Sequence, residues 1–364
     1  MESKRRLSGI RRIYEMSEKR PRVIIFSLYG RSGASSRYRI LQYISDIEEF
    51  ADVKICSFWP DSYNDKYMHH KKRYFLQIGL LYFLNSIKRI YQLLFIAPSF
   101  DRVIIQKGLI PRIKSTFLSN IKKKHVPILF DVDDAVYTIS RDNTNDIAAK
   151  SDLVLCGSEK LLEHYHEFND RTCYVPTVDD ERKYETLIHD TYPDKIIGWI
   201  GNSINLKNIE YIINPINNIV KRHPEVSFTI ICNTDKDLCK RILNSRLVQW
   251  DIDTYLEELS QISIGVMPLE DTEVNQGKCA FKLIQYMTMR KPVVASPVGE
   301  NVKVAKMGGY LGWTPDEWES RMEQLLFSRE SYYSAVDKIE NEFVPQYSYI
   351  SNLRILKDFI LNGV

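Results

Sequence analysis

Short apolar runs rich in Val and Ile alternate with segments of helical periodicity along most of the chain. In the first half, the predicted strands are residues 22–28, 52–58, 102–106, 127–132, 152–157 and 172–176. In the second half, they are residues 195–201, 226–232, 246–250, 262–268, 292–296 and 308–312. Near-continuous apolar strands are typical of parallel sheets that are covered on both faces. Strand–helix alternation in two blocks therefore predicts two doubly wound α/β domains.

Three further segments complete the predicted organisation. A charged stretch at 177–195 interrupts the alternation and indicates an interdomain linker. A last helix is predicted at 347–363. The apolar segment 74–95 is interrupted by Gln77, Asn85, Ser86, Lys88 and Arg89. It is too polar to span a bilayer, so we predict a core-facing helix, with contact to a membrane surface as the alternative.

Composition narrows the class of protein only a little. The 364 residues suffice for about two domains. A formal net charge of +3 gives no support for nucleic-acid binding. The six cysteines have neither CxxC nor metal-type spacing, so we expect reduced, buried thiols in a cytoplasmic protein. Residues 1–22 are strongly basic and offer two interpretations, a solvated tail or a contact with anionic lipid on the inner face of the cytoplasmic membrane.

Candidate chemistry is expected just after the strands, because open α/β sheets bind ligands at their carboxyl ends. After the first strand, Gly33 permits a tight turn and Ser36 lies at the start of a helix. A glycine turn that leads into a helix N-terminus can bind an anion. Arg37 and Arg39 lie beside it and can hold phosphate in a bidentate manner. The absence of GxGxxG argues against a nicotinamide cofactor.

Three acids, Asp131, Asp133 and Asp134, follow the strand at 127–132. Carboxylates this close repel one another, so something must offset their charge. A metal ion, a cation, hydrogen bonds to a polyhydroxylated ligand, and a purely structural capping role all remain open. We predict no metal, because no His or further carboxylate lies near enough in the sequence to complete a shell.

The second half places lysines where helices begin. After the strand at 195–201 come Gly201, Asn202 and Lys207, and the stretch "NQGKCAFKLIQYM" carries Lys278 and Lys282. Lys278, Lys282 and Gln285 are spaced four and three residues apart, so we expect them on one helix face. Cations at a helix N-terminus oppose the helix dipole unless an anion binds there. We therefore predict a diphosphate site.

Four segments, taken in order, resemble a known family. They are "GASSRYRILQYI", "FDVDDAVY", "IGWIGNS" and "IGVMPLEDTEVNQGKCAFKLIQYMTMRKPVVASPVGEN". Together they resemble the bacterial group 1 glycosyltransferases of the GT-B fold, over residues 22–360. The resemblance implies α/β architecture with two facing Rossmann-like domains and a C-terminal helix that crosses back to the first. It also implies a nucleotide-diphosphate sugar donor, retention of configuration and no obligatory metal.

The resemblance also implies roles for particular residues. Donor-side residues would be Gly201, Asn202, Lys207, Gly277, Lys278, Cys279, Lys282 and Gln285. Gly33, Ser36, Arg37 and Arg39 would line the acceptor or phosphate side. From the chemistry of sugar transfer, and not from the resemblance, we predict that Asp133, Asp134 and Lys282 are catalytic.

The sequence departs from the family at three positions. Gly277 and Gln285 replace two glutamates, eight positions apart, that many members carry, and Arg290 stands where the family usually has glycine. Without a side chain at 277, the donor sugar would be held by backbone amides of 278–281 or by nearby acids. The candidate acids are Glu270, Asp271 and Glu273.

We therefore expect a glycosyltransferase that acts on a glycan or lipid-linked acceptor in surface polysaccharide assembly, cytoplasmic and peripheral on the membrane. Two alternatives remain, a non-catalytic GT-B subunit of a glycan-assembly complex and a nucleotide-sugar epimerase. The predicted parts are a basic tail at 1–21, an acceptor-side domain at 22–177, a linker at 178–194, a nucleotide-sugar domain at 195–343 and a returning helix at 344–364.

Overall fold

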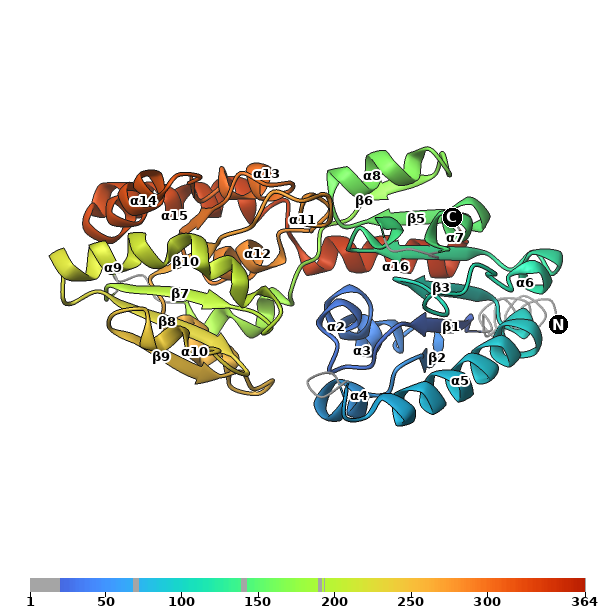
Figure 1. Ribbon diagram of the computed structural model, residues 1–364. Helices are drawn as coiled ribbons and strands as arrows, with labels where there is room; N and C mark the ends of the chain where they lie inside the picture. The colour runs from blue at the N-terminus through green and yellow to red at the C-terminus, as the bar shows by residue number, and fades with distance from the viewer. Residues whose placement is uncertain (1–19, 68–71, 139–142, 189–191, 193, 364) are drawn as a thin grey trace, which may run out of the picture.

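The chain forms two α/β domains, each built on a six-stranded parallel sheet, and they lie side by side in Figure 1. The structure is a computed structural model that describes residues 20–67, 72–138, 143–188, 192 and 194–363. The first sheet has the strand order β2-β1-β3-β4-β5-β6, and the second has the order β12-β11-β10-β7-β8-β9. All twelve strands fall within the twelve apolar runs predicted from the sequence, apart from one residue at the start of β9.

The strands of the first sheet are β1 (Arg22–Ser27), β2 (Asp52–Ser57), β3 (Arg102–Gln106), β4 (Ile128–Val132), β5 (Leu153–Cys156) and β6 (Thr172–Tyr174). Those of the second are β7 (Ile196–Ile200), β8 (Ser227–Cys232), β9 (Ser245–Gln249), β10 (Ile264–Met267), β11 (Val293–Ala295) and β12 (Gly309–Leu311). Alternate residues of the inner strands enter different cores. Val23 and Ile25 of β1 face one apolar cluster, whereas Ile24 and Phe26 face another, so the sheet is buried on both sides.

Helices cover both sheets (Figure 1). In the first domain they are α2 (Ala34–Arg39), α3 (Ile44–Ile47), α4 (Asp61–Lys66), α5 (Phe75–Tyr91), α6 (Ser119–Lys123), α7 (Thr144–Lys150) and α8 (Glu159–His166). In the second they are α9 (Ile213–Arg222), α10 (Tyr255–Ser260), α11 (Glu273–Gln276), α12 (Phe281–Thr288), α13 (Asn301–Ala305), α14 (Pro315–Phe327) and α15 (Arg329–Lys338). Local sequence sets their ends, as at α14, where Thr314 and Glu317 form a capping box and Pro315 occupies the first helical position.

The last helix, α16 (Tyr349–Asn362), packs on the first domain, as predicted (Figure 1). The ring of Tyr349 stacks on Tyr43 with centroids 4.4 Å apart. Arg102, at the start of β3, donates from Nε to the carbonyl of Phe359 at 3.1 Å and so ties down the C-terminal end of the helix. The first strand and the last helix of the described residues therefore belong to the same domain.

Helix α5 differs from the prediction of a core-facing helix. One side does face the core, where Ser86 and Arg89 are buried, and Leu93 just beyond the helix is fully buried. The opposite side carries large apolar residues that are exposed, among them Leu76 and Leu80. No helix in the described parts of the chain is long and apolar enough to cross a membrane.

The strand orders fix where loops can gather around a ligand. Chain connections leave β1 and β3 in opposite directions across the first sheet, and the same holds for β7 and β10 in the second. Such reversals open a crevice at the carboxyl ends of the two strands concerned. The loops after these four strands therefore define the region in which a ligand is expected.

Candidate functional site

Two lysines of the second domain lie together at the β7/β10 crevice. Lys282 occupies the first turn of α12, and Lys278 precedes that helix. Lys278 Nζ lies 3.3 Å from Asn205 Oδ1, in the loop after β7. Lys282 runs alongside Gly201 at the end of β7, where a Cβ on the glycine would come within 2.8 Å of Lys282 Cε. A side chain at 201 would therefore displace the lysine.

Neither lysine has an anionic partner within 4 Å among the described residues. Burial and the neighbouring charge of Lys278 lower the pKa of Lys282 to about 8. Burial also lowers the pKa of Lys278, although the carboxylate of Asp134 partly offsets that effect. Two partly buried ammonium groups without a counter-ion are costly unless an anion arrives, because each destabilises the other's charge.

The turn before α12 is strained in a way that sequence reasoning missed. Ala280 adopts φ +51°, in the left-handed region that non-glycine residues rarely enter. This turn makes Ala280 the N-cap and places Lys278 outside the helix, so the expectation that Lys278 belongs to the same helical face as Lys282 is wrong. The charge of Lys278 nevertheless acts on Lys282, and both side chains lie against residues that follow β7.

The acid cluster of the first domain is held by a lysine. Asp133 accepts a hydrogen bond from Ser35 Oγ at 2.7 Å and lies 3.6 Å from Lys107 Nζ. The same amine pairs with Asp134. Burial would lower the pKa of Lys107, but the charges of Asp133 and Asp134 outweigh it and raise the pKa above its usual value. A protein cation therefore offsets two of the three carboxylates.

Lys107 is the main residue that the sequence analysis missed. It follows β3 directly, at the first-domain crevice, and adopts φ +67°. Its position after a predicted strand was a usable signal, since three acids at the end of the neighbouring strand need a cation. Across the domain boundary, the charges of Lys278 and Lys282 also act on Asp134 and, with Lys107, lower its pKa although partial burial opposes the shift.

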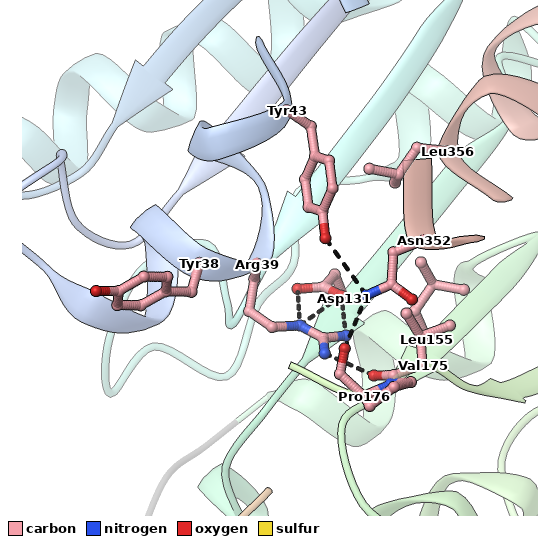
Figure 2. Close-up of a pocket in the computed structure, with 9 residues that line it drawn as sticks. All are labelled: Tyr38, Arg39, Tyr43, Asp131, Leu155, Val175, Pro176, Asn352 and Leu356. Carbon is pink, nitrogen blue, oxygen red and sulfur yellow. Dashed lines mark hydrogen bonds and ion pairs between the residues drawn. The ribbon is translucent and has the colours of Figure 1, made fainter. Parts of the chain in front are cut away.

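Asp131 and Arg39 form a buried ion pair, drawn in Figure 2. Arg39 Nε lies 3.1 Å from both carboxylate oxygens of Asp131, and Arg39 also donates to the carbonyl of Val175 at 2.6 Å. The guanidinium is therefore not available to a ligand, and the predicted role of Arg39 in phosphate binding is wrong. Tyr43, Asn352 and Leu356 also line the small cavity beside this ion pair. Neither Lys278 nor Lys282 lines it.

The other residues predicted for the acceptor side differ in their exposure. Ser36 is fully buried and donates to Gln106 Oε1 at 2.7 Å, so it holds the loop after β1 rather than a ligand. Gly33 is the N-cap of α2, where a Cβ would clash with Tyr29. Arg37 is partly exposed and reaches the second domain, with its guanidinium 5.1 Å from the ring of Trp250.

Gln285 and Gly277 lie against the first domain. Gln285 is buried, and its amide nitrogen is 3.4 Å from the hydroxyl of Tyr38. The ring of Tyr38 in turn packs 4.3 Å from that of Phe281. At Gly277, a Cβ would lie 2.5 Å from Cβ of Ala135, the residue after Asp134. In this arrangement a glutamate side chain does not fit at position 277.

The remaining donor-side residues lie at the edges of the crevice. Asn202 is exposed, and its side-chain oxygen accepts from Asn205 at 3.1 Å. Lys207 is 67% exposed and lies 3.5 Å from Glu270, so it already has a carboxylate partner. Cys279 is buried, and burial raises the pKa of its thiol to about 12, which keeps it neutral.

Arg290 lies away from this region. It adopts φ +59°, a left-handed conformation that glycine reaches at little cost. Its guanidinium donates to the carbonyl of Thr288 at 2.8 Å and pairs with Glu340. These contacts stabilise the arginine in a conformation that glycine would otherwise favour.

Comparison with known proteins finds a family match in the second domain. Residues 194–327 match the family model described as glycosyl transferases group 1. The match covers most of the second domain, which carries Lys278 and Lys282. No curated protein matches the chain significantly in sequence.

Solved structures of the same fold cover almost the whole chain. Anabaena Alr3699/HepE in complex with UDP and glucose superposes with a TM-score of 0.64 at 11% identity, over 94% of this chain and 100% of that one. The lipopolysaccharide outer core galactosyltransferase WaaB, in its apo form, gives 0.60 at 12% identity, over 94% and 100%. UDP-GlcNAc 2-epimerase from Neisseria meningitidis, bound to UDP-GlcNAc, gives 0.57 at 14% identity, over 93% and 99%. The chain has the GT-B fold, as predicted.

Proposed function

We propose that the protein transfers a sugar from a nucleotide-diphosphate sugar to a hydroxyl group of a glycan or lipid-linked acceptor, in the assembly of a surface polysaccharide. The observation that carries this proposal is the pair Lys278 and Lys282, two partly buried amines without an anionic partner within 4 Å among the described residues. They lie at the crevice of the domain that matches the group 1 family. A diphosphate would supply the missing charge.

The lysines would act on the leaving group. When the bond between the sugar carbon and the phosphate oxygen breaks, negative charge grows on the diphosphate. Lys282 and the N-terminus of α12 are fixed in place before that charge appears, and preorganised charges of this kind stabilise a transition state. Because these groups take the charge, we propose that the reaction needs no metal.

The acids of the first domain would position the acceptor. Asp134 has a side chain that is 45% exposed and lies at the domain boundary, whereas Asp133 is buried and bonded to Ser35. Asp134 is thus the better placed of the two to accept a hydrogen bond from an acceptor hydroxyl. The hydroxyl oxygen would bond to the sugar carbon, and its proton would pass to the leaving phosphate oxygen, which gives retention if both lie on one face of the sugar.

Recognition of the donor differs from that of many family members. Gln285 would hydrogen-bond the ribose once Tyr38 moves off its amide. Among the acids near Gly277, Glu270 pairs with Lys207, and Asp271 accepts from Gln276 at 2.8 Å. The donor sugar would therefore be held mainly by backbone amides of 278–281, with Glu273 as the remaining exposed acid.

The decisive test is Lys282→Ala, assayed for transfer with a panel of UDP-, GDP-, dTDP- and CMP-sugars and glycan acceptors. We expect transfer to fall by more than about 100-fold, the scale of losing one transition-state charge contact. The matched control is Lys306→Ala, an exposed lysine of the same domain that lies at the end of α13. A Lys282→Ala rate within about threefold of wild type would refute the assignment.

Two other functions keep specific support. The likeness to the Neisseria meningitidis epimerase favours an enzyme that converts a free nucleotide-sugar. The replacements at Gly277 and Gln285 favour a subunit that binds donor without turnover. A new nucleotide-sugar formed without any acceptor would identify the epimerase, whereas donor binding without product, with acceptor supplied, would identify the subunit.

A peripheral position on the cytoplasmic side of a membrane is part of the same proposal. The basic residues that suggested it lie mostly at 1–19, outside the described residues. Their contact with anionic lipid stays a prediction. It is tested by comparing vesicle binding of the full chain with that of a chain lacking residues 1–19.

A further inference from the structure

Helix α5 presents an apolar surface to solvent on the outside of the first domain (Figure 1). We call this surface the outer apolar face. It comprises eight large side chains, each at least 52% exposed: Phe75, Leu76, Leu80, Phe83, Leu84, Ile87, Tyr91 and Phe95. Most of them are three or four residues apart, so they form one stripe along the helix and its continuation at Gln92–Ile96.

Unlike an ordinary surface helix, α5 has apolar residues on both sides. On the side that faces the domain, Ile78, Leu81 and Ile90 pack against the core alongside the buried Ser86 and Arg89. The solvent side is mainly leucine and phenylalanine. Single exposed apolar residues are common, but a contiguous stripe of this length indicates a surface that is covered in use.

Charge around the stripe identifies what covers it. Residues 66–100 contain six Lys and Arg and no Asp or Glu. Of these cations, Lys72, Arg73 and Lys88 are exposed on α5 or just before it, and exposed Lys54 lies on the neighbouring edge strand β2. A second copy docked through this face would bring these like charges together, whereas an anionic lipid surface would attract them.

We propose that the outer apolar face lies in the interface of an anionic phospholipid membrane, with α5 parallel to the bilayer plane. A helix of 17 residues is about 25 Å long, enough for the leucine and phenylalanine side chains to enter the acyl boundary together. The flanking lysines and arginines then meet the headgroups. This surface is distinct from the basic N-terminal tail.

The buried side of α5 connects this surface to the crevice of the first domain. Arg89 donates to the carbonyls of Cys56 at 2.7 Å and Leu109 at 2.9 Å, which lie at or just beyond the carboxyl ends of β2 and β3. The helix is thereby fixed to the edge of the sheet that carries Lys107. If the proposed function holds, membrane docking would bring that edge toward a lipid-linked acceptor.

The test is co-sedimentation of the full chain with vesicles, without donor or acceptor. One vesicle contains phosphatidylcholine alone, and the other contains phosphatidylcholine and phosphatidylglycerol. We expect the wild type to prefer the anionic vesicles. Combined Leu76→Glu, Leu80→Glu and Leu84→Glu should weaken binding by at least about 10-fold.

The matched control introduces the same three charges at exposed apolar residues outside α5, as Leu243→Glu, Ile252→Glu and Ile350→Glu. The wild-type side chains at these positions are 43–46% exposed. It should bind within about twofold of wild type. Far-UV circular dichroism and elution volume check that both variants are folded. A second variant, Lys72→Gln with Lys88→Gln, should reduce the preference for anionic over neutral vesicles while leaving the fold intact.

Three outcomes would overturn the proposal. In the first, the α5 variant would bind vesicles with the same affinity as the control variant. In the second, only removal of residues 1–19 would abolish vesicle binding. Alternatively, the wild type would be a dimer without lipid that the α5 variant converts to a monomer, with vesicle binding unchanged. Because none of these measurements uses a nucleotide-sugar, failure of transfer activity and failure of docking are separate results.

Discussion

Donor binding should take up a proton at Lys282. In the ligand-free protein, burial and the charge of Lys278 hold the pKa of Lys282 at about 8, against an ordinary lysine value of 10.5. That difference corresponds to about 3 kcal/mol against the charged form. A diphosphate beside the amine would favour the ammonium and raise the pKa again. The Lys282 amine therefore gains a proton when donor binds at a pH near or above the pKa of the ligand-free protein.

The sign of the pH dependence follows from that shift. At pH values below the free pKa of about 8, Lys282 is already charged, so this group leaves donor affinity constant. Above it, part of the binding energy is used to take up the proton, and the affinity falls. Between pH 7 and pH 9 the dissociation constant should rise by about 10-fold, and about half a proton should be taken up per donor near pH 8.

Isothermal titration calorimetry at pH 8 measures this directly. Titrations in HEPES and in Tris, whose ionisation enthalpies differ, give the number of protons from the difference in apparent binding enthalpy. Lys282→Met is the control, because it should bind donor more weakly and with no buffer dependence from this position. A wild-type protein whose affinity is flat from pH 7 to pH 9, with equal enthalpies in both buffers, would refute the reasoning.

Four further outcomes are expected. Asp134→Asn should lower transfer by at least about 10-fold in a steady-state assay while donor binding by calorimetry changes less than about twofold, because the acid acts on the acceptor. Arg39→Met should reduce the free energy of unfolding by about 3–5 kcal/mol in urea titrations, because it leaves Asp131 buried and unpaired, and the double variant with Asp131→Leu should recover part of that loss. Gly277→Ala should increase the radius of gyration in small-angle scattering, because its Cβ would meet that of Ala135. Incubation with EDTA should leave the transfer rate within about twofold, since protein cations carry the charge.

The sequence was sufficient for the architecture because the signal is local and repeated. Every strand of both sheets lies in an apolar run that is visible without a structure, and the returning helix α16 was predicted within about two residues. Strand order was not readable from these runs. It comes from the paired registers of the strands in the structure.

The candidate site was predictable in part. The positions of Lys282 and the acids followed from where strands end, but the partners of individual charges did not. Arg39 resembles a phosphate ligand in the sequence, yet its partner Asp131 lies 92 positions away and removes it from solvent. The exposure of α5 could not be predicted from the sequence either. Periodicity shows which sides of a helix are apolar, but it does not show which of them packs against the core.

The chain passes between the domains twice, and the two passages lie against each other. Asn352, after the second passage, donates to the carbonyl of Pro176, just before the first, at 2.8 Å. Tyr349 N donates to Glu181 Oε2, within the first passage, at 3.0 Å. Both connections are thereby held to each other by hydrogen bonds. A single proteolytic nick in either passage would leave the two halves joined through the other.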